Sequence, residues 1–113
     1  MTDLSGEASG WHCPAELSLE FLAGKWRAMV IFWLLDGPKR FNELQRRLGA
    51  ITHRTLSKTL KEMEADGLVL RTDYGEIPPR VDYALTDRGR SLKPVLEAME
   101  RWAESDRATY RQT

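Results

Sequence analysis

The sequence predicts an α+β domain that is mainly helical and contains one β-hairpin. Residues 38–67 hold two amphipathic segments around a tight turn, with apolar residues three and four apart, which is typical of helices. Residues 68–85 change to a period of two around a break with glycine and proline, which is typical of two strands joined by a loop. The 113 residues are enough for one core, so we expect a single domain over residues 12–113 after a disordered tail over residues 1–11.

Charge is distributed unevenly along the chain, although the formal net charge is zero. Residues 1–37 carry two basic and five acidic residues, a net charge of −3. Residues 38–93 carry twelve basic and eight acidic residues, a net charge of +4, and the remainder has a net charge of −1. Basic charge is thus concentrated where the two amphipathic helices are predicted, and a local basic patch is sufficient for contact with phosphates.

The sequence also argues against several classes of protein. No apolar run approaches the ~20 residues that span a bilayer, and the first ten residues lack the basic and apolar parts of a signal peptide. We therefore expect a cytoplasmic protein that does not enter a membrane. Cys13 is the single cysteine, and together with two histidines it provides too few ligands for a structural zinc site. No glycine-rich phosphate loop follows a predicted strand, so neither a metal nor a cofactor is expected.

The second amphipathic segment predicts a helix over residues 52–66 that is suited to a DNA groove. At about 100° per residue, Leu56, Leu60 and Met63 form a narrow buried stripe. The outward face mixes cations that can bind phosphates with hydroxyls that can reach base edges or phosphate oxygens. It comprises Arg54, Thr55, Ser57, Lys58, Lys61 and Glu62.

Both helices of the pair have recognisable boundaries. Asn42, followed three residues later by Gln45, resembles a capping box at the start of the first helix. Thr52 is suited to the N-cap of the second helix, and Gly67 to the left-handed conformation that ends it. The short turn at residues 49–50 forces the two helices to cross. The alternative is a pair of surface helices of any all-α domain whose charges are merely solvated.

The β-hairpin follows the helix pair directly. Residues 68–71 and 80–85 are the predicted strands, and the loop between them cannot be helical. In a winged helix-turn-helix such a hairpin is the wing. Arg80, near its tip with Tyr74, would then meet the minor groove or adjacent phosphates. A plain antiparallel hairpin that closes the core, with Arg80 in solvent, is the alternative.

Additional helices are predicted at both ends of the domain. One begins at Cys13-Pro14, and a second, over about residues 25–35, is apolar almost all round and is expected to be the central core helix. Thr86 is expected to cap a long final helix that is kinked at Pro94. Its apolar stripe is better explained as a dimer interface than as more core for so small a domain, with a self-contained core helix as the alternative. The stripe consists of Leu92, Val95, Leu96, Met99, Trp102 and Ala103.

Several motifs occur in a fixed order over residues 12–104. They are Cys13-Pro14, GKW at 24–26, LLDGPKRFNEL at 34–44, LKEMEADGLVLR at 60–71, PPRVDYALTDRGRSL at 78–92 and PVLEAMERW at 94–102. Together they resemble the HxlR family of bacterial transcription regulators, which are MarR-like winged helix-turn-helix proteins. The resemblance implies extra N- and C-terminal helices that form a homodimer. It also implies binding to palindromic double-stranded promoter DNA as a repressor or an activator.

The resemblance also implies which residues contact DNA. The recognition helix would span residues 52–65, and the wing would span residues 68–85 with Arg80 as its phosphate or minor-groove contact. For His53, an exposed capping residue without a direct role is the alternative. The residues carried over to the recognition helix are Thr52, His53, Arg54, Thr55, Ser57, Lys58 and Lys61.

Cys13 matches an N-terminal cysteine that senses oxidants or electrophiles in some members of this family. A thiol at a helix N-terminus can have its pKa lowered by the free amides and the helix dipole. A buried cysteine that acts as a small apolar residue at the dimer interface is the alternative. Because the chain has no second cysteine, a disulfide would have to join Cys13 to its dimer mate, another protein or a small thiol.

Three functions can be weighed on the sequence alone. The favoured one is a dimeric DNA-binding transcription regulator whose effector is an oxidant, an electrophile or a small ligand. The alternative is a winged-helix protein-interaction module without specific DNA binding, which the zero net charge allows. An enzyme is least favoured, because Cys13 beside His12 supplies neither an orienting carboxylate nor an identifiable oxyanion hole.

Overall fold

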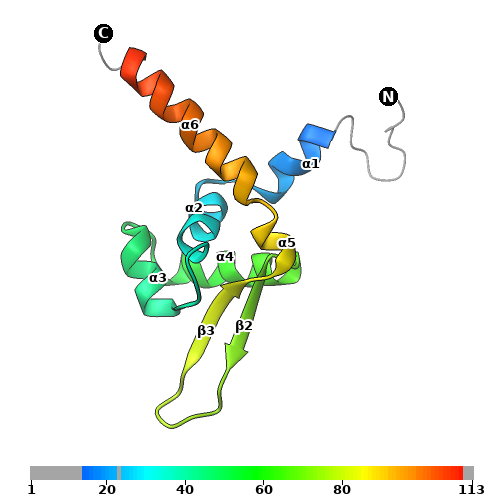
Figure 1. The fold of residues 1–113 in the computed structure, drawn as a ribbon. Helices are drawn as coiled ribbons and strands as arrows, with labels where there is room; N and C mark the ends of the chain where they lie inside the picture. The colour runs from blue at the N-terminus through cyan, green and yellow to red at the C-terminus, as the bar shows by residue number, and fades with distance from the viewer. Residues whose placement is uncertain (1–13, 23, 111–113) are drawn as a thin grey trace.

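The computed structural model describes residues 14–22 and 24–110, with side chains up to residue 107. Helices form the body of the molecule, a hairpin projects from one side of it, and the first and last helices project from the other side (Figure 1). The elements in chain order are α1 (Pro14–Phe21), α2 (Lys25–Leu34), β1 (Lys39–Arg40), α3 (Phe41–Leu48), α4 (His53–Ala65), β2 (Val69–Asp73), β3 (Val81–Leu85), α5 (Asp87–Arg90) and α6 (Lys93–Tyr110). The predicted mainly helical α+β fold with a wing is confirmed.

A small antiparallel sheet supports the hairpin. Its strand order is β1-β3-β2, and β2 pairs with β3 from Val69 opposite Leu85 to Asp73 opposite Val81. Strand β1 was not predicted, because its two residues become a strand only by pairing with β3. Lys39 of β1 is buried, and its Nζ lies 2.6 Å from Oδ1 of Asp36. This hydrogen bond lowers the pKa of Asp36.

One hydrophobic core joins α2, α3, α4 and the sheet. Helix α2 lies at its centre, as predicted, although Phe32 on its outer side stays exposed. The predicted inner stripe of α4 is fully buried, and Ile51 in the preceding turn is buried with it. The buried apolar residues are Val30, Ile31, Leu34, Leu44, Leu48, Ile51, Leu56, Leu60, Met63, Leu68, Val69, Leu85 and Leu96.

The predicted capping box at the start of α3 is wrong. The N-cap is Arg40, which makes no side-chain cap, and Asn42 is the second residue of the helix. Pairing of β1 with β3 extends the chain as far as Arg40, so the N-cap lies two residues earlier than predicted. Gln45 has a different role, because its Nε2 donates to the carbonyl of Ile51 at 3.2 Å and fixes the turn between α3 and α4.

The predicted long final helix is two helices. Thr86 caps the first of them, α5, by accepting from the amide of Gly89 at 3.0 Å. Helix α5 ends after four residues, and α6 then begins at Lys93. Pro94 lies in the first turn of α6, where its missing N–H is not needed. The predicted kink at Pro94 is therefore wrong. The apolar period of three and four continued across the break and concealed it.

Helix α5 packs closely against the start of β2. A Cβ at Gly89 would lie only 2.2 Å from the carbonyl oxygen of Leu68, so the backbone of α5 rests directly on the chain that enters β2. Thr86 adds two bonds to the same place, from its amide to Leu68 (3.1 Å) and from its hydroxyl to the carbonyl of Gly67 (2.6 Å). The hairpin and the start of the C-terminal helices are therefore joined at one point.

The N-terminal predictions are tested only in part. Helix α1 begins at Pro14, as expected, but none of its residues is buried, and Leu17 stays exposed. Cys13 and the predicted tail over residues 1–11 lie outside the described residues. Among the residues that the structure describes, no helix is both long and apolar enough to cross a membrane.

Candidate nucleic-acid interface

Helix α4 has the boundaries that its sequence predicts. The hydroxyl of Thr52 accepts from the amide of Thr55 at 3.1 Å, which satisfies one of the free donors at the start of the helix. Gly67, just after the last turn, has φ of +78° and allows the chain to leave the helix in the left-handed conformation. Burial of Leu56, Leu60 and Met63 then fixes the rotation of the helix, so its opposite face points outward.

The outward face of α4 brings the predicted DNA-contact residues together. Thr52, His53, Arg54, Lys58 and Lys61 are exposed, and Thr55 and Ser57 are half-buried beside them. A shallow hollow of about 560 Å³ runs along this face. It is lined by His53, Arg54, Ser57, Lys58, Lys61 and Glu62.

The cations of this face differ in whether they are already paired. Lys58 Nζ lies 3.8 Å from Glu62 Oε2, one helical turn further on. Arg54 and Lys61 have no ion-pair partner among the described residues, which leaves both cations available to phosphates. The ring of His53 lies 4.6 Å from the ring of Phe41 in α3, so His53 also helps to join the two helices of the pair.

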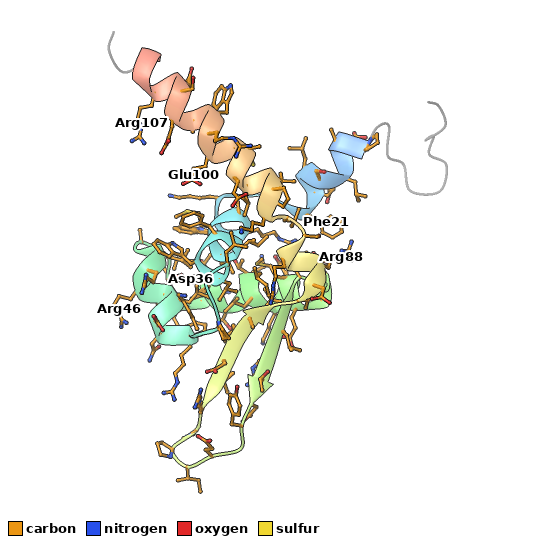
Figure 2. All side chains as sticks on the ribbon, in the orientation of Figure 1. Phe21, Asp36, Arg46, Arg88, Glu100 and Arg107 are labelled. Atoms are coloured by element: carbon orange, nitrogen blue, oxygen red, sulfur yellow. The ribbon has the colours of Figure 1, made fainter. Side chains whose placement is uncertain are left out.

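A second hollow, of about 440 Å³, separates the start of α3 from the wing. Arg40 and Arg46 provide its basic residues, and Arg46 points away from the body of the protein (Figure 2). Neither arginine was among the predicted site residues, although both belong to the run of basic residues that starts at Lys39. Arg47 points elsewhere, because its guanidinium lies 5.2 Å above the Trp33 ring and 3.5 Å from Glu43.

Arg80 does not lie near the tip of the wing, as the sequence suggested. Its carbonyl accepts from the amide of Tyr74 at 3.0 Å, so these two residues close the base of the loop. Its Nη2 lies 3.3 Å from Oδ2 of Asp82, and its guanidinium lies 4.7 Å from the centre of the Tyr74 ring. The hydrogen bond to Asp82 raises the pKa of Arg80.

The position of Asp82 is the physical reason for this difference. Residues two apart on a strand share a face, so Asp82 offers its carboxylate to Arg80 along the same edge of the hairpin. Asp82 is buried and also lies 4.0 Å from Arg40 of β1. At the tip itself Ile77 is 98% exposed, and its neighbour Glu76 is exposed beside it. The wing therefore presents both an apolar and an acidic side chain at its tip, with its arginine held further up the stem.

The described residues contain no cluster of three or more His, Cys, Asp or Glu side chains that could hold a metal ion. The candidate site is therefore a polar and basic surface on α3, α4 and the wing, without an enclosed pocket for a small substrate. Such a surface can bind phosphates and base edges. A family model described as HxlR-like helix-turn-helix matches residues 21–110 of the chain.

The chain belongs to this family. HxlR-like relatives include the HTH-type transcriptional regulator YybR of Bacillus subtilis (strain 168), which is 45% identical over 95 residues, covering 84% of this chain and 76% of YybR. The HTH-type transcriptional regulator BH0655 of Halalkalibacterium halodurans is 48% identical over 90 residues, covering 79% of this chain and 80% of BH0655. Among solved structures, the redox regulator HypR in its oxidised form superposes with a TM-score of 0.77 at 45% identity, over 82% of this chain and 96% of HypR.

Membership of the HxlR-like family decides the general function. The chain is a DNA-binding transcription regulator with a winged helix-turn-helix, and the family is one of regulators rather than enzymes. Within that fold, α3 and α4 are the helix-turn-helix and β2 and β3 form the wing. In such pairs the second helix is the one that lies in the major groove, and the second helix of the pair in this chain is α4.

Proposed function

We propose that this regulator binds a two-fold symmetric promoter site as a homodimer. Each copy places the outward face of α4 in a major groove, with contacts from Thr52, His53, Arg54, Thr55, Ser57, Lys58 and Lys61. Arg40 and Arg46 lie beside α4 and extend the basic surface toward the wing. The two recognition helices would then read half-sites about 34 Å apart on one side of the duplex.

The observation that carries the proposal is the separation of two kinds of exposed surface. Polar and basic residues gather on α3 and α4, whereas six of the nine exposed large apolar residues among the described residues lie on α1, α2 and α6 and the other three on the wing. These surfaces lie on different sides of the molecule (Figure 1). One side is therefore suited to a polyanion, and the other to a second protein chain.

A shallow apolar groove on the second side supports a partner copy as its occupant. The groove, of about 330 Å³, lies between α2 and α6 and is lined by Ala28, Met29, Phe32, Leu96, Met99, Glu100 and Ala103. Leu17 and Leu19 of α1, together with Val95 and Trp102 of α6, extend this exposed apolar surface. A second copy of the same surface, related by a two-fold axis, would bury the groove residues and the apolar residues that extend the groove.

We propose an oxidant or an electrophile as the effector, with Cys13 as its target. Support comes from the likeness to HypR, which is described as a redox regulator, and from the place of Cys13 in the sequence just before α1. An alkylated or oxidised Cys13 would then alter DNA binding, whereas Cys13→Ser would bind DNA equally with and without oxidant. Equal oxidant sensitivity of the wild type and Cys13→Ser would contradict this part of the proposal.

Selection of bound sequences from a random DNA pool, followed by affinity measurements, tests the DNA-binding surface. Arg54→Ala combined with Lys58→Ala should abolish preference for the selected site and reduce the salt dependence, by about 0.9 in slope for each phosphate that is no longer bound. Lys93→Ala combined with Arg101→Ala is the matched control, because it removes two exposed cations from α6 outside the apolar stripe. Unchanged specific binding by the α4 variant would overturn the assignment of α4.

A further inference from the structure

A partly buried arginine joins the end of α1 to the end of the recognition helix. Arg27, in the first turn of α2, donates from Nη1 to the carbonyl of Phe21 at 3.3 Å and to Oδ2 of Asp66 at 2.7 Å. Its Nη2 lies 3.9 Å from Glu62, one turn before Asp66 on α4. Only 14% of the Arg27 side chain is exposed, whereas the side chains of Asp66 and Glu62 are 39% and 49% exposed, so the arginine is shielded from water and its partners are partly open to it.

A second arginine makes a parallel connection between the same two ends. The guanidinium of Arg88, in α5, lies 4.3 Å from the centre of the Phe21 ring, and its Nη1 donates to the carbonyl of Asp66 at 3.2 Å. Phe21 and Arg88 lie next to each other where α1 meets α5 (Figure 2). The last residue of α1 is therefore held between two arginines that both bind Asp66.

The site of attachment matters because Asp66 is the C-cap of α4. Its amide donates to the carbonyl of Glu62 at 3.0 Å, so the residue belongs to the last turn of the helix. Hydrogen bonds between a guanidinium and a carboxylate are roughly twice as strong as neutral ones, which makes Arg27 a firm attachment. Because α4 has 13 residues, it is about 20 Å long, and a tilt of about 5° at one end moves the other by about 1.7 Å. Such a shift is enough to break hydrogen bonds to base edges.

Helix α1, in contrast, is held by few contacts of its own. None of its residues is buried, and Leu19 lies largely in solvent. The C-terminal end of α1 is attached to the body of the protein by the bonds at Phe21 together with the packing of Phe21 and Leu22 against the core. A force that moves α1, such as docking of a second copy on its apolar side, acts on Asp66 through Arg27 and Arg88.

We propose that Arg27 is a positioning residue for DNA binding, which couples the placement of α1 to the tilt of the recognition helix. The inference rests on the proposed function, because it takes α4 as the helix that reads DNA. Arg27 itself cannot serve as a phosphate contact, since its guanidinium is bound to carboxylates and shielded from solvent. Loss of Arg27 should therefore change how well the sequence is read without changing how many phosphates are bound.

The test uses the full-length chain with Arg27→Gln, Asp66→Asn and the double variant, and Arg101→Gln as the charge-matched control on the exposed side of α6. Affinity is measured for a selected DNA site and for random DNA over a range of salt. Each single variant should weaken specific binding about tenfold and leave random binding within about twofold, with the salt slope unchanged. The double variant should be no worse than Arg27→Gln alone, because Asp66→Asn removes only a bond that Arg27→Gln already removes.

Hydrogen exchange of the free protein tests the connection without DNA. Asp66→Asn keeps the size of the side chain and should speed exchange in α1 as well as in the last turn of α4, whereas a purely local cap would affect α4 alone. Folded variants with specific affinity within twofold of Arg101→Gln would overturn the proposal, as would unchanged exchange in α1. A wild type that binds no DNA while Asp66→Asn still loosens α1 would instead contradict the proposed function and leave the connection standing.

Discussion

The two long helices of the molecule, α4 and α6, are both amphipathic but use their apolar faces in opposite ways. In α4 the side chains of Leu56, Leu60 and Met63 are at most 1% exposed, and the outward face is polar and basic. Among the described side chains of α6 only Leu96 is buried, whereas Met99 is 50% and Trp102 is 69% exposed. A single chain therefore completes the packing of α4 and leaves that of α6 incomplete.

The difference shows which part of the sequence specifies the fold and which specifies an assembly. The apolar stripe of α4 fixes the rotation of the recognition helix and thereby the direction of its cations. In α6 the stripe contributes Leu96 to the core and leaves Val95, Met99 and Trp102 exposed, where the proposed dimer would bury them. Substitutions in α4 should thus act on each chain separately, and substitutions in α6 should act on the association of two chains.

The largest difference between α4 and α6 is expected in the loss of stability when one methionine of each helix is replaced by alanine. Met63→Ala removes a fully buried side chain and should lower the free energy of unfolding by about 2–5 kcal/mol at every protein concentration. Met99→Ala should lower stability only in the concentration range where the wild type is dimeric. Urea denaturation at several protein concentrations makes the comparison. Equal losses for both variants in dilute protein would mean that α6 is packed within the single chain.

Trp102→Glu should separate the two chains. A charge within the proposed apolar interface should raise the dimer dissociation constant by about 100-fold, which corresponds to about 2.7 kcal/mol. Sedimentation equilibrium measures the constant, and circular dichroism establishes that the monomer is folded. Arg101→Glu, at the neighbouring exposed position outside the stripe, is the control. Unaltered dimerisation of Trp102→Glu would move the interface away from α6.

Thr52→Ala tests the start of the recognition helix. The cap from the Thr52 hydroxyl to the Thr55 amide should contribute about 1 kcal/mol to the free energy of unfolding. Thr52→Asn should retain most of that contribution, because asparagine is an equally good N-cap. Thermal or urea unfolding of the wild type and the two variants measures this contribution. If Thr52→Asn lost as much stability as Thr52→Ala, the N-cap hydrogen bond would not be the source of the stabilisation.

The smallest contrast comes from two exposed ion pairs with the same spacing. Lys58 and Glu62 lie 3.8 Å apart on α4, and Lys93 and Glu97 lie 3.7 Å apart on α6. Glu62→Gln and Glu97→Gln should each change stability by less than about 0.5 kcal/mol, because the further contact of Glu62 with Arg27 is long, at 3.9 Å, and Asp66 keeps Arg27 paired at 2.7 Å. Only Glu62→Gln should tighten DNA binding, by about twofold, since it releases Lys58 and removes a negative charge beside the phosphates. Fluorescence anisotropy with labelled DNA measures the affinity of both variants. An equal gain in DNA affinity for Glu97→Gln would mean that the change in net charge, and not the release of Lys58, causes the effect.

Elements with a strong local pattern could be predicted from the sequence. The boundaries of α4 follow from a cap, an uninterrupted stripe and a glycine, all of which act within one helix. Strand β1 could not be predicted, because only its pairing with residues more than forty positions later makes it a strand. The break between α5 and α6 was missed because apolar spacing continued across it, and the close contact of Gly89 with Leu68 involves two elements at once.

In the candidate site, too, the locally encoded parts could be predicted and the parts that depend on distant residues could not. Residues of α4 were found because the face of a helix can be read from its period. The orientation of Arg80 is fixed by its contacts with both Asp82 and Tyr74. The sequence alone does not show that these two residues lie within reach of the Arg80 guanidinium. The bond between Arg27 and Asp66 joins positions 39 residues apart and has no sequence signal at all.

The contact at Gly89 has a consequence for the spacing of DNA half-sites. The missing side chain lets the backbone of α5 lie directly against Leu68, and α6 leaves from that point. In the proposed dimer, the direction of α6 sets how far apart the two copies of α4 are held. Any larger residue at position 89 would wedge α5 outward and alter the number of base pairs that the dimer spans. The missing Cβ of Gly89 therefore helps to set the half-site spacing that the proposed dimer can bind.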